Sequence, residues 1–196
     1  KMGNNFKKIA NEELQPDNFS FSNENLLKAK DIVKMYPKNY RESSIMPLLS
    51  MAQSQNDGWL PKKAIEYVSK FLNVPEMKVL EIATFYSMYN LSPVGKHHIE
   101  ICTTSPCMLR GSDNLLEKLK NWIGINTGEI TDDNKFSLNR VECLGACVNA
   151  PVVKINENYY EDLDLQSFEE LINKLSNNKN VKMGPQSSRK GSEPKK

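Results

Sequence analysis

All four cysteines of this chain lie in one stretch, as two close pairs. Cys102 and Cys107 are separated by four residues, Cys143 and Cys147 by three, and 35 residues lie between the two pairs. Two short loops that a fold brings together can present their sulfurs to one point. The spacing therefore predicts a single site with four cysteine ligands.

Three kinds of chemistry use four cysteines. A disulfide framework is typical of small secreted domains, and a chain of 196 residues without the pattern of a secretory signal peptide does not fit that class. A structural zinc site fits, because zinc binds four thiolates and accepts ligand pairs spaced by about two to four residues. An iron–sulfur cluster fits as well, since small residues such as Gly145 and Ala146 let backbone N–H groups approach the sulfurs. On residue chemistry alone, zinc and an iron–sulfur cluster both remain open.

Several segments of the chain resemble one protein family. Residues 141–163 begin with V-E-C-L-G-A-C-V-N-A-P, and C-T-T-S-P-C occupies 102–107. Three further motifs lie upstream, namely G-W-L-P at 58–61, A-T-F-Y-S-M-Y-N at 83–90 and P-V-G-K at 93–96. Over 19–175 the chain is similar to the NuoE-type small iron–sulfur subunit, in the flavoprotein fraction of respiratory complex I (NADH:ubiquinone oxidoreductase).

This resemblance implies a thioredoxin-like [2Fe-2S] ferredoxin domain that holds one [2Fe-2S] cluster. By the same resemblance, Cys102, Cys107, Cys143 and Cys147 are the four cluster ligands. Because each pair lies on one short loop, we expect Cys102 and Cys107 on one iron and Cys143 and Cys147 on the other. Such a cluster leaves no open position for a substrate, so we expect electron transfer and no catalytic residue in this chain.

The resemblance also implies partners. A larger flavoprotein subunit would bind FMN and NADH, and the large iron–sulfur subunit of complex I would be a second partner. The cluster is then expected near the FMN but off the main path of clusters, as a transient electron store, while the whole enzyme reduces ubiquinone and translocates protons. The missing initiator methionine and the similarity to mitochondrial relatives favour the matrix side of the mitochondrial inner membrane, with the cytoplasmic face of a bacterial membrane as the alternative.

Two other functional classes stay open at this stage. The chain is also compatible with a stand-alone ferredoxin, or with the matching subunit of a soluble diaphorase in a hydrogenase or a formate dehydrogenase. A zinc-stapled adaptor without a redox role is the second class.

Composition excludes several further classes. Hydrophobic residues make up 39% and charged residues 26% of the chain, as in ordinary globular proteins. The net charge of +2 comes from the tail 177–196, which holds six basic residues and one acidic residue, so that no basic stripe for nucleic acid is expected on the folded part. The charge-free run 82–95 is only 14 residues long, too short to span a bilayer. No Gly-rich nucleotide fingerprint or Walker motif is present, so FMN and NADH are expected elsewhere.

Hydrophobic periodicity divides the chain into four parts and predicts an α+β fold. We expect an extended N-terminal arm at 1–21, a bundle of four amphipathic helices at 22–92 and the thioredoxin-like domain at 96–176 with the order β, α, β, β, β, α. The basic tail at 177–196 has no apolar period, which predicts either a solvated tail or one laid along a partner. Five large side chains of the helical part are assigned mainly to its core, namely Trp59, Phe85, Tyr86, Met88 and Tyr89.

Residues beside the cysteines suggest how the site is supported. A helix capped by Ser112 or Asp113 follows Cys107, and its N-terminal dipole would favour a thiolate. Arg110 is a candidate for offsetting the charge of the cluster. His97 and His98 are adjacent on a predicted strand and therefore point to opposite faces, so we expect them not to be ligands of one metal ion.

Overall fold

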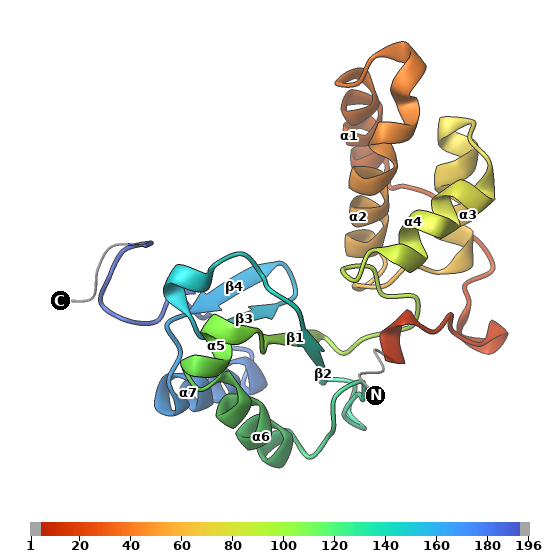
Figure 1. Ribbon diagram of the computed structural model, residues 1–196. Coiled ribbons are helices and arrows are strands. Elements are labelled where there is room, and N and C mark those ends of the chain that lie inside the picture. Colours follow the sequence, from red (N-terminus) through yellow and green to blue (C-terminus); the bar gives the residue numbers. More distant parts are fainter. Residues whose placement is uncertain (1–4, 193–196) are drawn as a thin grey trace. The chain divides into compact units, whose positions relative to one another are not determined.

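A computed structural model describes residues 5–192 and divides the chain into two compact units (Figure 1). The helical unit is Asn5–Val94, and the second unit begins at Gly95. The predicted arm and tail extend to residues 1–4 and 193–196, which lie outside the described residues. Each unit has a hydrophobic core of its own.

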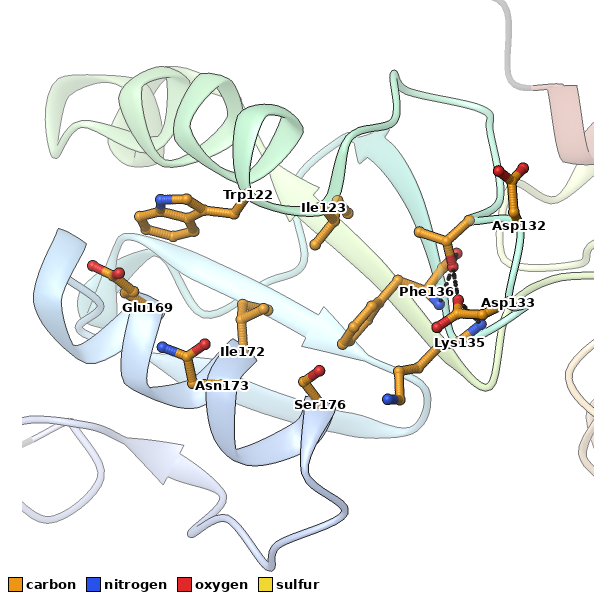
Figure 2. A pocket seen from close by; sticks show the side chains of 11 residues that line it. Trp122, Ile123, Asp132, Asp133, Lys135, Phe136, Glu169, Ile172, Asn173 and Ser176 are labelled. Atoms are coloured by element: carbon orange, nitrogen blue, oxygen red, sulfur yellow. Dashed lines mark hydrogen bonds between the residues drawn. The ribbon is translucent and has the colours of Figure 1, made fainter.

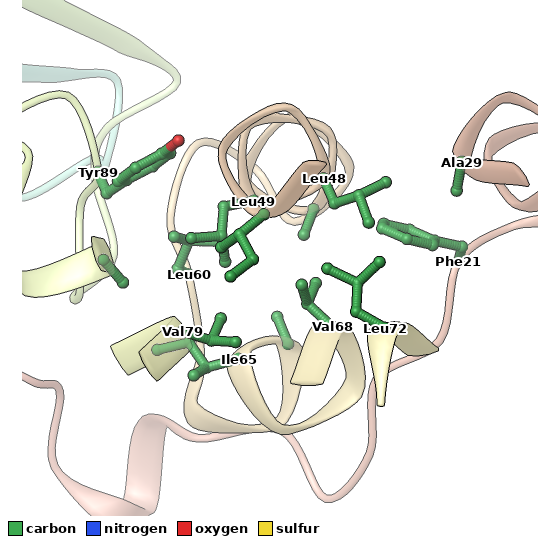
Figure 3. Packing of buried hydrophobic residues seen from close by; sticks show 14 of the residues in the cluster. Phe21, Ala29, Leu48, Leu49, Leu60, Ile65, Val68, Leu72, Val79 and Tyr89 are labelled. Atoms are coloured by element: carbon green, nitrogen blue, oxygen red, sulfur yellow. The ribbon is translucent and has the colours of Figure 1, made fainter. Parts of the chain in front are cut away.

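The helical unit is built on four α-helices whose apolar faces share one core (Figure 3). Each helix supplies at least one fully buried side chain, such as Ala29, Leu48, Val68 and Val79. This follows from the apolar spacing in their sequences. Among the described residues the helices of this unit are η1 (Asn5–Lys7), η2 (Glu12–Leu14), α1 (Asn23–Lys34), η3 (Lys38–Ser44), α2 (Ile45–Gln55), α3 (Lys62–Leu72) and α4 (Glu76–Phe85), the η elements being short 3-10 helices.

The helix ends largely follow their predicted signals. The Ser22 hydroxyl accepts a hydrogen bond from the N–H of Asn25 at 3.2 Å, which confirms the predicted cap of α1. α4 ends at Phe85, four residues before the predicted Tyr89, because Tyr86 turns to an extended conformation (φ −79°, ψ 124°).

The N-terminal arm is neither fully extended nor detached where the structure describes it. Phe6 is buried, and the N–H of Ala10 donates to the carbonyl of Leu91 at 2.9 Å. The ammonium group of Lys7 donates to the carbonyl of Ala83 at 3.0 Å, near the C-terminal end of α4, where a helix dipole favours positive charge. The arm therefore packs against the helices that follow it.

The core assignment of the five large side chains is only partly correct. Trp59 and Tyr89 are buried, at 8% and 0% exposure. Phe85, Tyr86 and Met88 are exposed, at 79%, 38% and 42%, because they lie where α4 ends and the chain turns away from the core. The prediction that these three residues belong to the core is wrong.

The second unit is a mixed sheet with helices. The strand order is β2-β1-β3-β4-β5, in which β1 runs parallel to β2 and antiparallel to β3. The strands are β1 (His97–Cys102), β2 (Phe136–Val141), β3 (Val152–Ile155), β4 (Asn158–Glu161) and β5 (Gly184–Pro185). The helices are α5 (Ser105–Leu109), α6 (Ser112–Ile123), η4 (Cys147–Asn149) and α7 (Leu165–Ser176).

Strand β1 is the central element of this unit. Ile99 and Ile101 alternate toward the core, where they share a cluster with Leu119 of α6 and Phe168 of α7. These two helices lie side by side against the sheet (Figure 1). Since neighbouring strand residues point to opposite faces, Cys102 lies on the other side of β1 from Ile101.

Two predictions about this unit need correction. The residue that caps α6 is Gly111, in a left-handed conformation (φ 93°), and not Ser112 or Asp113, because the short helix α5 ends directly before it. The tail is neither solvated nor free for a partner along residues 184–189, since β5 pairs with β4 and Arg189 forms an ion pair with Asp162. A buried carboxylate needs a cation, and the tail supplies one.

Candidate metal centre

The first cysteine pair lies at the end of β1. Cys102 is the last residue of this strand, and Cys107 lies within α5, which Thr104 opens as the preceding cap residue. Both sulfurs belong to nearly inaccessible residues, each 1% exposed. The two cysteines pack in one small apolar cluster with Ala150 and Val152.

The second pair lies at the surface. Cys143 follows β2 and is exposed, whereas Cys147 begins η4 and is half-buried. Their sulfurs are 3.3 Å apart. Gly145, between them, has a left-handed backbone (φ 83°), which directs its N–H toward the sulfur of Cys143 at 3.4 Å.

The sheet explains why the two loops meet. β1 and β2 are parallel, with Cys102 opposite Val141, so both strands deliver their cysteine loops at the same edge. The contact is direct, because the N–H of Leu144 in the second loop donates to the sulfur of Cys102 in the first. The N–H of Val152, at the start of β3, donates to the sulfur of Cys107.

The protonation of the buried pair is uneven. Burial opposes ionisation of Cys102, but hydrogen bonds from the Thr104 hydroxyl at 3.2 Å, the Thr104 and Leu144 N–H groups and the Cys107 thiol together lower its pKa. Burial raises the pKa of Cys107, and the neighbouring Cys102 adds to this effect. One thiol of the pair is therefore prepared to become a thiolate, which is the form that binds metal.

The arrangement tests the three chemistries that four cysteines allow. All four cysteines are free in the structure, which contradicts a disulfide framework. Within residues 5–192, no group of three or more His, Cys, Asp or Glu side chains is placed to hold one metal ion. The sulfurs form two separate close pairs with backbone N–H donors, and this donor set fits a two-iron cluster in which each iron takes two protein sulfurs.

The neighbouring charged residues differ from expectation in one respect. Arg110 is exposed at the end of α5, so its charge-offsetting role stays a prediction. Arg140, which the sequence did not single out, donates to the hydroxyl of Thr103 and lies 4.0 Å from the carboxylate of Asp113. Its position on a strand three residues before Cys143 was the available signal.

The two histidines are strand residues, as predicted. His98 is 5% exposed, its Nδ1 lies 2.7 Å from the hydroxyl of Ser137, and burial lowers its pKa to about 4. His97 stacks obliquely near Phe136, with ring centroids 5.5 Å apart.

A groove of about 480 Å³ lies elsewhere in this unit (Figure 2). Trp122, Phe136 and Ile172 line it, and none of the cysteines is among its lining residues. The groove is thus separate from the metal centre.

The comparison with known families decides between zinc and iron. Residues 29–176 match the family of thioredoxin-like [2Fe-2S] ferredoxins. The chain belongs to this family. The group that this ferredoxin holds is therefore a [2Fe-2S] cluster, in agreement with the paired sulfurs.

Relatives of this ferredoxin include respiratory proteins. It is 57% identical over 160 residues to the NADH-quinone oxidoreductase subunit of Rickettsia bellii that is designated E, covering 82% of this chain and 96% of the relative. It is 47% identical over 175 residues to NADH dehydrogenase [ubiquinone] flavoprotein 2, mitochondrial, of Dictyostelium discoideum, covering 89% and 71%.

One solved structure shares the fold of this ferredoxin. A chain of an NAD+-reducing [NiFe]-hydrogenase in the H2-reduced state superposes with a TM-score of 0.57 and 23% identity, over 67% of this chain and 23% of that longer chain. Among the described residues, no helix has both the length and the apolar character needed to cross a membrane.

Proposed function

We propose that the chain is the small iron–sulfur electron-transfer subunit of the NADH-dehydrogenase module of respiratory complex I. The support is the high identity over nearly the full length of relatives that are named as NADH-quinone oxidoreductase subunits, together with membership of the ferredoxin family. When bound, the cluster accepts and returns one electron at a time. This chain positions the cluster and adjusts its charge balance, and the enzyme's substrates bind to other subunits.

The proposed ligands are Cys102, Cys107, Cys143 and Cys147, with one loop serving each iron. The observation that carries this assignment is the hydrogen bond from Leu144 to the sulfur of Cys102, because it joins the two loops through a sulfur. Donors of this kind stabilise the negative charge that a thiolate-bound cluster gains on reduction.

The second cysteine pair indicates where electrons enter and leave. Cys102 and Cys107 are buried, whereas Cys143 is exposed. The pair at the surface brings one side of the cluster close to a docked protein. We assign this side to the partner flavoprotein subunit that carries FMN and the NADH site, with the large iron–sulfur subunit as the second neighbour.

The helical unit is assigned a docking role. We regard α1 to α4 as a four-helix bundle, and the exposed Phe85, Tyr86 and Met88 at the end of α4 support contact with a partner, because aromatic residues and Met are enriched in interface cores. The proposed location is peripheral, on the matrix side of the mitochondrial inner membrane, which the Dictyostelium relative supports. The Rickettsia relatives support the alternative, the cytoplasmic face of a bacterial membrane.

The decisive experiment measures metal and labile sulfide in the protein purified without oxygen. The proposal expects iron and acid-labile sulfide in equal amounts, visible absorption, and an EPR signal that appears after reduction with dithionite. A colourless protein with one zinc ion would establish the adaptor function instead.

A matched pair of variants tests the ligands. Cys143→Ser should lose the wild-type EPR signal, whereas Ser105→Ala, an exposed neighbour of Cys107 in α5, should keep it. Co-purification with an FMN-containing chain tests the assignment to the NADH-dehydrogenase module, and isolation as a partner-free monomer from its native membrane would contradict it.

A further inference from the structure

The tail forms a strap across the second unit, defined here as residues 184–191. It begins as β5, which pairs with β4 so that Gly184 lies opposite Tyr160 and Pro185 opposite Glu161. The N–H of Gln186 continues this pairing with a bond of 2.9 Å to the carbonyl of Glu161. The strap lies beyond the part of the chain that matches the ferredoxin family, which ends at residue 176.

A buried ion pair fastens the strap. The carboxylate of Asp162 is 0% exposed and the side chain of Arg189 is 9% exposed. Nε of Arg189 donates to Oδ2 of Asp162 at 2.5 Å, and a second guanidinium nitrogen donates to Oδ1. The Ser187 hydroxyl adds a bond of 2.9 Å to the same carboxylate. This two-pronged geometry is specific to arginine, since a lysine ammonium cannot reproduce it.

The same residues reach the second cysteine loop. Arg189 also donates to the carbonyl of Val148 at 3.0 Å, and the side-chain amide of Asn149 donates to the carbonyl of Gly191 at 3.0 Å. Val148 and Asn149 directly follow Cys147 in η4. In addition, the N–H of Asp162 donates to the carbonyl of Asn149 at 2.7 Å. Asp162 is thus bonded to the loop by its backbone and to the strap by its carboxylate.

The loop has little support of its own. η4 has only three residues, and Val148 is 66% exposed. A single 3-10 turn at the surface opens easily, because few buried contacts oppose its opening. The bonds from Arg189 and Asp162 to the loop and from Asn149 to Gly191 therefore supply much of what fixes the backbone that carries Cys147.

We propose that the strap fixes the second cysteine loop and that Arg189 is a positioning residue for Cys147. The role of Cys147 as a ligand rests on the proposed function, whereas the immobilisation of the loop is a property of the chain alone. Arg189 acts through Asp162 and Val148, and it does not touch a sulfur. Loosening the strap should let the loop open and release iron from the exposed side of the cluster.

The test compares three single variants with the wild type. Hydrogen–deuterium exchange of the amides 146–150 reports on the loop with and without the cluster, and the rate of iron transfer to a chelator reports on retention. Arg189→Gln should speed both by at least tenfold and alter the EPR spectrum of the reduced cluster. Arg189→Lys should recover part of the loss. Lys182→Ala removes a positive charge from an exposed site of the tail and should behave as the wild type.

Two results would overturn the strap. One is exchange and iron release in Arg189→Gln at the wild-type rates, and the other is an equal effect of Lys182→Ala, which would reduce the role to general charge. If Arg189→Gln does not fold, the double variant Asp162→Asn/Arg189→Gln removes both buried charges, and its loop should still exchange faster than in the wild type. Absence of iron and sulfide from the wild type would refute the proposed function, while the exchange of its cluster-free loop would still decide the strap.

Discussion

At the scale of single residues, Cys102 is the sulfur that joins the two halves of the site. It accepts bonds from Thr104 of its own loop and from Leu144 of the other. A donor that holds a thiolate stabilises the reduced, more negative cluster, so each such bond raises the reduction potential. Removing one donor should therefore lower the potential.

Thr104→Val is the sharpest form of this prediction. The substitution keeps the branched shape, and the hydroxyl makes no capping bond to α5, so the helix should form as before. If the lost bond is about 1 kcal/mol stronger in the reduced state, the midpoint potential falls by roughly 40 mV. Redox titration followed by EPR measures it, with Ser105→Ala as the neighbouring control, and an unchanged midpoint would show that this hydroxyl does not influence the cluster.

Two arginines allow a comparison of charge effects. Arg140 is held against Thr103, next to Cys102, whereas Arg110 is exposed at the end of α5. Solvent screens the exposed charge more strongly. Arg140→Gln should therefore lower the midpoint potential more than Arg110→Gln does, and the same redox titration checks both. No change for Arg110→Gln would remove that residue from the charge balance.

At the scale of elements, β1 carries a pH-dependent contribution to stability. Burial lowers the pKa of His98 to about 4, against about 6.5 in an unfolded chain, with a smaller opposing effect from Glu100. Between these values the unfolded chain binds a proton that the folded chain does not. The free energy of unfolding should therefore fall as the pH drops from about 6.5 to about 4.

Unfolding in urea at pH 7 and pH 5 measures this contribution. Over that interval His98 should account for a loss of roughly 2 kcal/mol, as an upper value, since each pKa unit corresponds to about 1.4 kcal/mol. His98→Gln should show a smaller difference between the two pH values than the wild type. His97→Gln, at a half-buried position of the same strand, should retain most of the difference. Equal pH dependence in His98→Gln and wild type would assign the loss to other groups.

At the scale of the whole molecule, the two compact units contain one tryptophan each. Trp59 is buried in the helical unit, and Trp122 lies at 36% exposure on α6 in the other. Metal binding free energy adds to the folding free energy of the unit that holds the metal. Stripping the iron should therefore destabilise the second unit alone.

Thermal unfolding of two single-tryptophan variants tests this separation. In Trp59→Phe, where Trp122 reports, iron removal should lower the midpoint on the order of 10 °C or more, since about 1 kcal/mol shifts a domain of this size by several degrees. In Trp122→Phe, where Trp59 reports, the midpoint should stay within about a degree. A joint shift would show that the units unfold together.

Much of the molecule follows from local sequence patterns. The apolar spacing of α1, the Ser22 cap, the alternation of Ile99 and Ile101 and the hairpin turn near Asn156 all depend on interactions between residues close in sequence. The two cysteine pairs were recognisable for the same reason, since each pair occupies one short loop.

Other features depend on contacts between distant segments. The bond from Leu144 to Cys102 exists only because β1 and β2 pair in parallel, and the ion pair of Asp162 and Arg189 joins residues from separate elements. The exposure of Phe85 likewise depends on where α4 ends relative to its core. Strand register and long-range pairing follow from the free energy of the complete fold, which no local period encodes. The sequence could therefore name the four sulfurs, while the tertiary structure decided which backbone groups and which part of the tail hold them.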